Sequence, residues 1–235
     1  YILGIDIGTT AIKGAVIGED GKIYGTKTSE YPLTTLPTGE VEADLQLYIN
    51  AFTQSIKGAV EDAKVDVADI KCVGFSSTAE TCVFLDKYNE PLCKVIAWMD
   101  TRATKEAEYL TAHFDKKDII NKVGFDGIYA IHPVSKILAV KNKNPEIFEK
   151  TRMFAQIKDY FIYRLTGEYY TDHSTASDHG FFDITNRCYW NEMLEFTGIK
   201  EEYLPKLVEP GTELGTISRE AALEFGLNPE TKINV

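Results

Sequence analysis

The chain opens with YILGIDIGTT (residues 1–10), an apolar run of strand length that carries a carboxylate, Asp6, at its centre. Burying a carboxylate is costly unless it is paired, hydrogen-bonded or close to a metal ion. Because Asp6 would repel a phosphate group directly, we expect it to hold Mg²⁺, either directly or through water. The first residues of the chain therefore predict a metal-binding carboxylate in a buried strand.

The residues that follow this strand have the chemistry of a phosphate-binding turn. Gly8 allows a tight turn and a close approach to an anion, and the hydroxyls of Thr9 and Thr10 can bond phosphate oxygens. Lys13 offers a positive charge to the same phosphates. The segment 8–13 is thus a candidate nucleotide site.

The pattern of apolar residues predicts strands and helices in an α/β order with mixed strand directions. Residues 11–17 and 22–25 read as two strands around the turn Asp20-Gly21, which excludes a Walker A loop because that loop runs into a helix. Apolar residues recur at helical spacing from Leu45 to Val60, with Asp44 placed as the N-cap. Further predictions are a strand over 70–75 beside the first, a hairpin from 82–85 to 95–98, helices over 100–110, 133–140, 157–166, 190–197 and 220–225, and a strand over 231–235.

Composition limits the partners of the protein. The net charge of −11 argues against nucleic acid or an anionic membrane as a partner and favours a small ligand. No apolar stretch is long enough to span a membrane, no leader precedes Tyr1, and the four cysteines have no metal-ligand spacing, so we expect a cytoplasmic protein with reduced thiols. Both ends lie within predicted strands, which indicates a fragment of a longer protein, and a homodimer stays open.

Two polar segments are candidates for binding a sugar or polyol. Thr78, Ala79 and Glu80 follow a predicted inner strand, and a carboxylate there could accept hydrogen bonds from hydroxyls. The segment 98–102 (WMDTR) combines the indole of Trp98 with the charges of Asp100 and Arg102 at a strand-to-helix junction. The alternatives are a solvated hairpin residue for Glu80, a core indole for Trp98 and a helix N-cap for Asp100.

A third cluster, Asp172, His173, Asp178 and His179, contains residue types that bind zinc. It lacks the helical spacing of two histidines that common zinc sites use. The metal hypothesis is therefore the weaker one for this segment.

Taken in order, several segments resemble the N-terminal domain of the FGGY carbohydrate kinase family over essentially the whole chain. The segments that carry the resemblance are Asp6-x-Gly8-Thr9-Thr10, residues 74–81, Trp98-x-Asp100-x-Arg102, residues 158–168 and Thr171-Asp172-x-Ser174-x-Ala176-Ser177. The resemblance implies an α/β, ribonuclease H-like fold of the actin and hexokinase type, with a mixed five-stranded sheet flanked by helices. It also implies ATP-dependent phosphorylation of a sugar or polyol hydroxyl, with residues 1–235 as the N-terminal domain.

The resemblance assigns Asp6, Thr9 and Thr10 to the Mg-ATP phosphates, with Lys13 at a position that is often basic. Glu80 matches the substrate-binding Glu of glycerol kinases, whereas Ala79 replaces the Arg that precedes it there. Xylulose kinases have Met-His at these two positions, so the sugar is left open between xylulose, gluconate and related acceptors.

The resemblance further implies that the general-base Asp and the adenosine site belong to a C-terminal domain beyond Val235. This chain alone should then be inactive. Two other functions stay open: a non-catalytic sugar sensor or actin-like module of the same fold, and a metal-dependent hydrolase that uses Asp172, His173 and His179.

Overall fold

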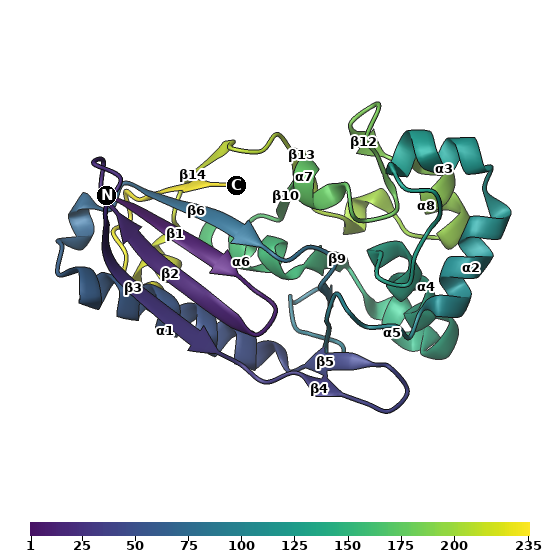
Figure 1. Ribbon diagram of the computed structural model, residues 1–235, viewed down its shortest axis with the longest axis horizontal. Helices are drawn as coiled ribbons and strands as arrows, with labels where there is room; N and C mark the ends of the chain where they lie inside the picture. Colours follow the sequence, from purple (N-terminus) through teal and green to yellow (C-terminus); the bar gives the residue numbers. More distant parts are fainter.

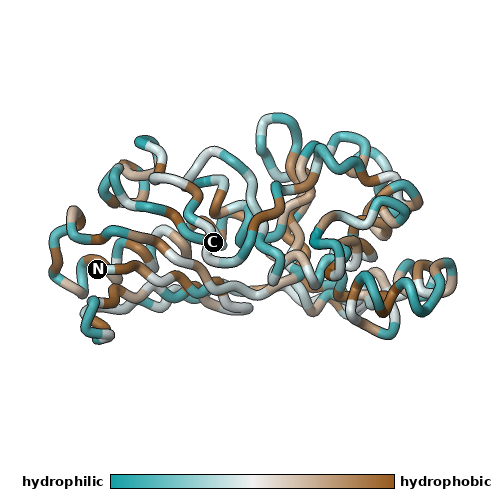
Figure 2. Tube along the Cα trace, turned by 90° about the horizontal axis from the view of Figure 1, so that it is seen from above, coloured by the Kyte–Doolittle hydropathy of each residue, from teal (hydrophilic) through white to brown (hydrophobic).

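The computed structural model describes all residues from Tyr1 to Val235. It is elongated, with a large sheet toward one end and most of the short helices toward the other (Figure 1). The N-terminus lies at the sheet end, and the C-terminus lies further toward the middle of the molecule. In Figure 2 hydrophilic and hydrophobic stretches alternate along the backbone in both parts.

The large sheet has six strands in the order β14-β15-β6-β1-β2-β3. Their bounds are Glu213–Thr216, Lys232–Asn234, Cys72–Ser77, Ile2–Ile7, Ala11–Ile17 and Ile23–Glu30, respectively. β1, β2 and β3 form the predicted antiparallel meander, and β6 runs parallel to β1 as predicted. The expectation of five strands in this sheet is wrong, because the short segment β14 also pairs with β15. The sequence of β14, ELGT, contains a glycine and is too short to show the alternation of polar and apolar residues that predicts a strand.

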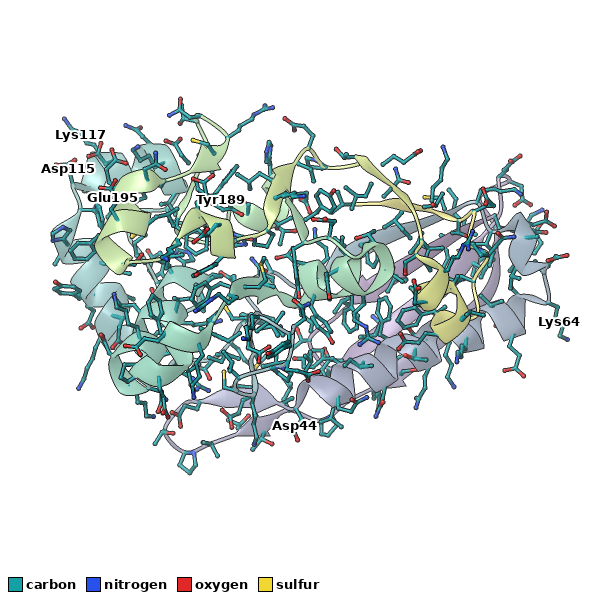
Figure 3. The ribbon with its side chains drawn as sticks, turned by 180° about the vertical axis from the view of Figure 1, so that it is seen from behind. Asp44, Lys64, Asp115, Lys117, Tyr189 and Glu195 are labelled. Carbon is teal, nitrogen blue, oxygen red and sulfur yellow. The ribbon has the colours of Figure 1, made fainter.

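One face of this sheet is covered by α1 (Leu45–Ala63), α6 (Ile157–Thr166) and α9 (Arg219–Phe225). α1 packs closely because glycines face it: a Cβ on Gly14 would lie 2.5 Å from the Ser55 carbonyl oxygen. The predicted apolar stripe of α1 is confirmed. Asp44 occupies the N-cap position without a side-chain capping bond, and Lys64 ends the helix in a left-handed conformation; Figure 3 labels both.

The opposite face of the sheet carries no apolar layer. Side chains alternate along β1, so Leu3, Ile5 and Ile7 are buried, while Asp6 points to the other face with 43% of its side chain exposed. The expectation of a buried carboxylate is therefore wrong. The neighbouring strand β6 leaves open space on the sheet at Gly74, where an added Cβ would contact no atom within 4 Å.

A second sheet of five strands joins the two parts of the molecule, in the order β4-β5-β8-β7-β9. These strands are Thr34–Thr35, Val41–Ala43, Val95–Ile96, Cys82–Leu85 and Met153–Gln156. The predicted hairpin of β7 and β8 is confirmed by the pairing of Cys82 with Ile96. One side of this sheet contributes to the core beneath the large sheet and the other to a second core among the helices.

The helical part contains α2 (Thr104–His113), α3 (Lys116–Val123), α4 (Pro133–Lys143), α5 (Pro145–Lys150) and α8 (Asn191–Thr197). α4 begins at a proline and α6 ends at Gly167 in a left-handed conformation, as their sequences predict. Asp115 caps α3 by accepting a hydrogen bond from the Lys117 N–H (Figure 3). Two small sheets, β10 (Tyr170–Asp172) with β13 (Lys206–Val208) and β11 (Phe182–Asp183) with β12 (Cys188–Tyr189), the short helix α7 (His173–Ala176), and 3₁₀ turns at Val67–Asp69 and Glu201–Tyr203 complete the fold. None of the helices has the length and apolar content that crossing a lipid bilayer requires.

Candidate active site

Asp6 lies near the end of β1, directly opposite Lys13 on β2. The Lys13 Nζ is 3.5 Å from the Asp6 Oδ2, and the two side chains are 59% and 43% exposed. An ion pair this exposed contributes little to stability, so water or a ligand can replace it at low cost. Asp6 therefore remains free to bind a ligand on the open face of the sheet.

The turn between β1 and β2 is held in a fixed shape. The Gly8 N–H donates to the Ala11 carbonyl oxygen at 3.0 Å, and the Tyr31 hydroxyl donates to the Gly8 carbonyl oxygen. A Cβ on Gly8 would lie 2.9 Å from the same Ala11 oxygen, so the turn requires glycine. Thr10 is exposed at the tip, which leaves its hydroxyl available to an anion.

Trp98 and Thr78 bring the two candidate regions together. The Trp98 Nε1–H donates to the Thr9 hydroxyl oxygen at 3.0 Å, across 89 residues of sequence. The Thr78 N–H donates to the Ile7 carbonyl oxygen at 2.9 Å, so the segment after β6 begins beside the end of β1. The predicted phosphate turn and the predicted sugar segments thus lie next to each other.

Glu80 is the most unusual residue of this site. Its backbone is left-handed, with φ at 65°, and only 9% of the residue is exposed. No group of the protein donates a hydrogen bond to its carboxylate. Burial, together with the negative charge of Asp178, raises its pKa to about 7 against the opposing effect of Lys136. A strained, buried and unpartnered carboxylate indicates a ligand-binding role.

The backbone of Glu80 is fixed by two buried side chains that the sequence analysis missed. The Glu80 N–H donates to the Gln156 Oε1 at 2.6 Å, and the Glu80 carbonyl oxygen accepts from the Lys136 Nζ at 2.7 Å. The Lys136 ammonium also donates to the carbonyl oxygens of Ala97 and Trp98, each at 3.0 Å. Lys136 therefore ties the Glu80 turn to the Trp98 segment. A lysine on the apolar side of α4 was the available signal.

Asp100 and Arg102 have partners within the protein. The fully buried Asp100 carboxylate accepts from the Val41 N–H at 2.6 Å and from the Arg102 Nε and backbone N–H, each at 2.9 Å. The Arg102 guanidinium also reaches Glu42 at 3.1 Å. The expectation that Asp100 bonds a sugar hydroxyl finds no free acceptor here; the pair instead anchors the Trp98 segment to β5.

The cluster of Asp172, His173, Asp178 and His179 does not form a metal site. Asp172 caps α7 by accepting from the Ser174 and Thr175 N–H groups, and its carboxylate is paired with the buried Lys158. His179 is buried, and burial lowers its pKa to about 3. No group of three His, Cys, Asp or Glu side chains is placed to hold a metal ion. Asp172 is therefore committed to other contacts, whereas both ring nitrogens of His179 are buried without a hydrogen-bond partner. The structure argues against the metal-dependent hydrolase because no third ligand is placed beside such a pair.

A single carboxylate is nevertheless suited to one kind of metal ion. Mg²⁺ in nucleotide sites is commonly held by one or two carboxylates, with waters and substrate phosphates completing its coordination. Asp6, half-exposed beside the Gly8 turn, fits this donor set.

Comparison with known proteins agrees with this fold. The chain is 29% identical over 235 residues to the xylulose kinase of Bacillus subtilis (strain 168), covering 99% of this chain and 46% of that protein. It is 31% identical over 236 residues to the gluconokinase of the same organism, covering 98% and 44%. The crystal structure of ligand-bound xylulose kinase from Lactobacillus acidophilus has a TM-score of 0.92 at 30% identity, covering 100% of this chain and 47% of that one.

These likenesses confirm the predicted fold class, that of actin and hexokinase. Residues 1–235 match the FGGY family of carbohydrate kinases, N-terminal domain. The chain belongs to this family. It spans less than half the length of the relatives it matches.

Proposed function

We propose that residues 1–235 are the N-terminal domain of an ATP-dependent carbohydrate kinase that phosphorylates a hydroxyl of a sugar or polyol. Acceptors of the xylulose or gluconate type are the leading candidates. The observation that carries the proposal is the Trp98–Thr9 hydrogen bond, because it brings the phosphate turn against the segment that carries Glu80 and Trp98. Phosphoryl transfer depends mainly on positioning the two substrates and neutralising charge.

The nucleotide end of the site is the β1–β2 hairpin. Asp6 would hold Mg²⁺, and the Gly8 backbone with the Thr9 and Thr10 hydroxyls would contact the phosphates of ATP. Lys13 adds a positive charge that can leave its exposed pair with Asp6. When bound, Mg²⁺ neutralises negative charge on the phosphate oxygens.

The acceptor end is formed by the segments after β6 and β8. The Glu80 carboxylate lacks a partner in the protein and would accept hydrogen bonds from acceptor hydroxyls. The half-buried indole of Trp98 can pack on the C–H face of a sugar, and Thr78 and Ala79, which directly precede Glu80, are half-buried and would contact the same acceptor. Asp100 and Arg102 act on this site by holding Trp98 in place.

The partner of this domain is a second domain of the same protein. The curated relatives are more than twice as long as this chain, and the face of the large sheet that carries Asp6 has no apolar layer over it. Family resemblance puts the general base and the adenosine site in that second domain. Closure of the two lobes would exclude water from the phosphate. We therefore expect residues 1–235 alone to release no ADP in response to a sugar.

The test is ADP release by the full-length protein with glycerol, D-xylulose, gluconate, L-ribulose and other ketoses. We expect Asp6→Asn to lower kcat by about 100-fold or more with little change in the KM of the sugar. Glu80→Ala should chiefly raise that KM. Asp20→Asn is the matched control, because Asp20 forms a similar exposed pair with Lys22 at the far end of β2.

Two results would oppose the proposal. The reverse pattern of the two variants would exchange the roles of Asp6 and Glu80. Sugar binding without ADP release by the full-length protein would favour the non-catalytic sugar sensor of the same fold.

A further inference from the structure

Asp178 is a second carboxylate of the acceptor site that no resemblance assigns. It follows α7, is half-buried and receives no hydrogen bond from the protein. Burial raises its pKa above the usual range. Like Glu80, it is a carboxylate that burial desolvates and to which no protein group donates a hydrogen bond.

Gln156 joins the backbone of Asp178 to that of Glu80. The Gln156 Oε1 accepts from the Glu80 N–H at 2.6 Å, and the Gln156 amide donates to the Thr175 carbonyl oxygen at 3.4 Å. The Asp178 N–H donates to that same Thr175 oxygen at 3.4 Å. One buried side chain therefore links the Glu80 turn, through the Thr175 carbonyl oxygen, to the turn that carries Asp178. The negative charge of Asp178 contributes to the raised pKa of Glu80.

The cations near these carboxylates are already engaged. The Lys136 ammonium donates to three backbone carbonyl oxygens, and the Lys158 ammonium is paired with Asp172 and Thr175. The guanidinium of Arg102 is bonded to Asp100 and Glu42. The charge of Lys136 attracts the Glu80 carboxylate, but no cation donates a hydrogen bond to this side chain, which is nine-tenths buried.

We propose that Glu80 and Asp178 form a two-carboxylate acceptor site that selects uncharged polyhydroxylated compounds and rejects sugar acids. Hydroxyl groups of a neutral ketose or polyol donate to both carboxylates and supply the hydrogen bonds that the protein withholds. A substrate carboxylate at the same place meets two acidic groups, and the one nearby ammonium, Lys136, has already donated its hydrogen bonds to backbone oxygens, which disfavours binding. This inference rests on the proposed function and narrows its two leading acceptors to the xylulose type.

The experiment measures, with the full-length protein, the binding of D-xylulose and of gluconate by calorimetry and the kcat/KM for each. We expect wild type to favour D-xylulose by about 100-fold or more in both measurements. Asp178→Asn should raise the KM of D-xylulose about tenfold, with kcat nearly unchanged, and should reduce the discrimination against gluconate by about tenfold. Asp118→Asn, an exposed aspartate on α3, is the isosteric control and should change neither value.

Equal or tighter binding of gluconate by wild type would overturn the inference, as would an unchanged ratio in a folded Asp178→Asn variant. The wild-type comparison needs no variant and so does not depend on the folding of Asp178→Asn. The two proposals fail differently. If the protein releases no ADP with any acceptor, the kinase proposal fails. The calorimetric comparison of D-xylulose with gluconate would still test whether Glu80 and Asp178 select neutral ligands.

Discussion

Replacing Glu80 by glutamine removes a carboxylate that the fold buries without a hydrogen-bonding partner, and should stabilise the domain. Its pKa rises from the usual 4.5 to about 7, because burial and Asp178 outweigh Lys136. A shift of this size corresponds to at most about 3 kcal/mol of unfavourable free energy at high pH. Since water retains contact with part of the carboxylate, we expect about 1 kcal/mol.

The pH dependence has a definite sign. Below 4.5 Glu80 is protonated in both the folded and the unfolded chain, so Glu80→Gln and wild type should be equally stable. Between 4.5 and about 7 the folded chain binds more protons than the unfolded chain, so wild type loses stability as the pH rises through this window. The variant lacks this loss and should be more stable by the full amount above 7.

Urea unfolding followed by circular dichroism at both ends of this pH range measures the difference. Glu19→Gln is the matched control, because Glu19 is exposed in the β2–β3 turn, and it should show no pH-dependent difference. Glu80→Gly should add about 1 kcal/mol more, since it also relieves the left-handed backbone. A Glu80→Gln variant that is less stable than wild type above 7 would refute the idea of an uncompensated carboxylate.

Three further substitutions test the parts that hold the site in place. Lys136→Met should destabilise the protein by about 3 kcal/mol in urea unfolding and raise the KM of the sugar, because three carbonyl oxygens lose their buried donor; unchanged kinetics would show that the ammonium does not position the site. Gly8→Ala should lower kcat at least about tenfold in the coupled ADP assay, since its Cβ would lie 2.9 Å from the Ala11 carbonyl oxygen. Gly74→Ala, with open space around it, is the control and should stay active. Equal activity of the two variants would show that the turn does not require glycine. Asp100→Asn should lower the free energy of unfolding by about 2 kcal/mol or more, because it breaks a buried ion pair; a loss of sugar affinity without loss of stability would instead restore Asp100 as a ligand.

Local patterns predicted the parts of the fold that are set by neighbouring residues. The stripe of α1, the proline start of α4 and the glycine end of α6 follow from helical spacing and capping preferences. The hairpin at the start of the chain and the adjacent parallel strand were also predicted. The sixth strand was missed because a four-residue edge strand with a glycine leaves no periodic pattern.

Contacts between distant residues account for the errors in the site. Asp6 was expected to be buried because it lies within an apolar run, yet only one face of the sheet carries helices. The pairing of Asp100 with the Val41 backbone spans 59 residues, and that of Glu80 with Gln156 spans 76, so neither has a local signal. Sequence therefore named Glu80 and Trp98, whereas only the fold revealed Lys136 and Gln156 as their supports.

The most direct measurement is a crystal structure of the full-length protein with Mg²⁺, a non-hydrolysable ATP analogue and D-xylulose. The account predicts Mg²⁺ within about 5 Å of the Asp6 carboxylate, directly or through one water, and a sugar hydroxyl about 2.7 Å from a Glu80 carboxylate oxygen. Phosphates bound away from the Gly8 turn, or an acceptor that leaves Glu80 without a contact, would contradict it.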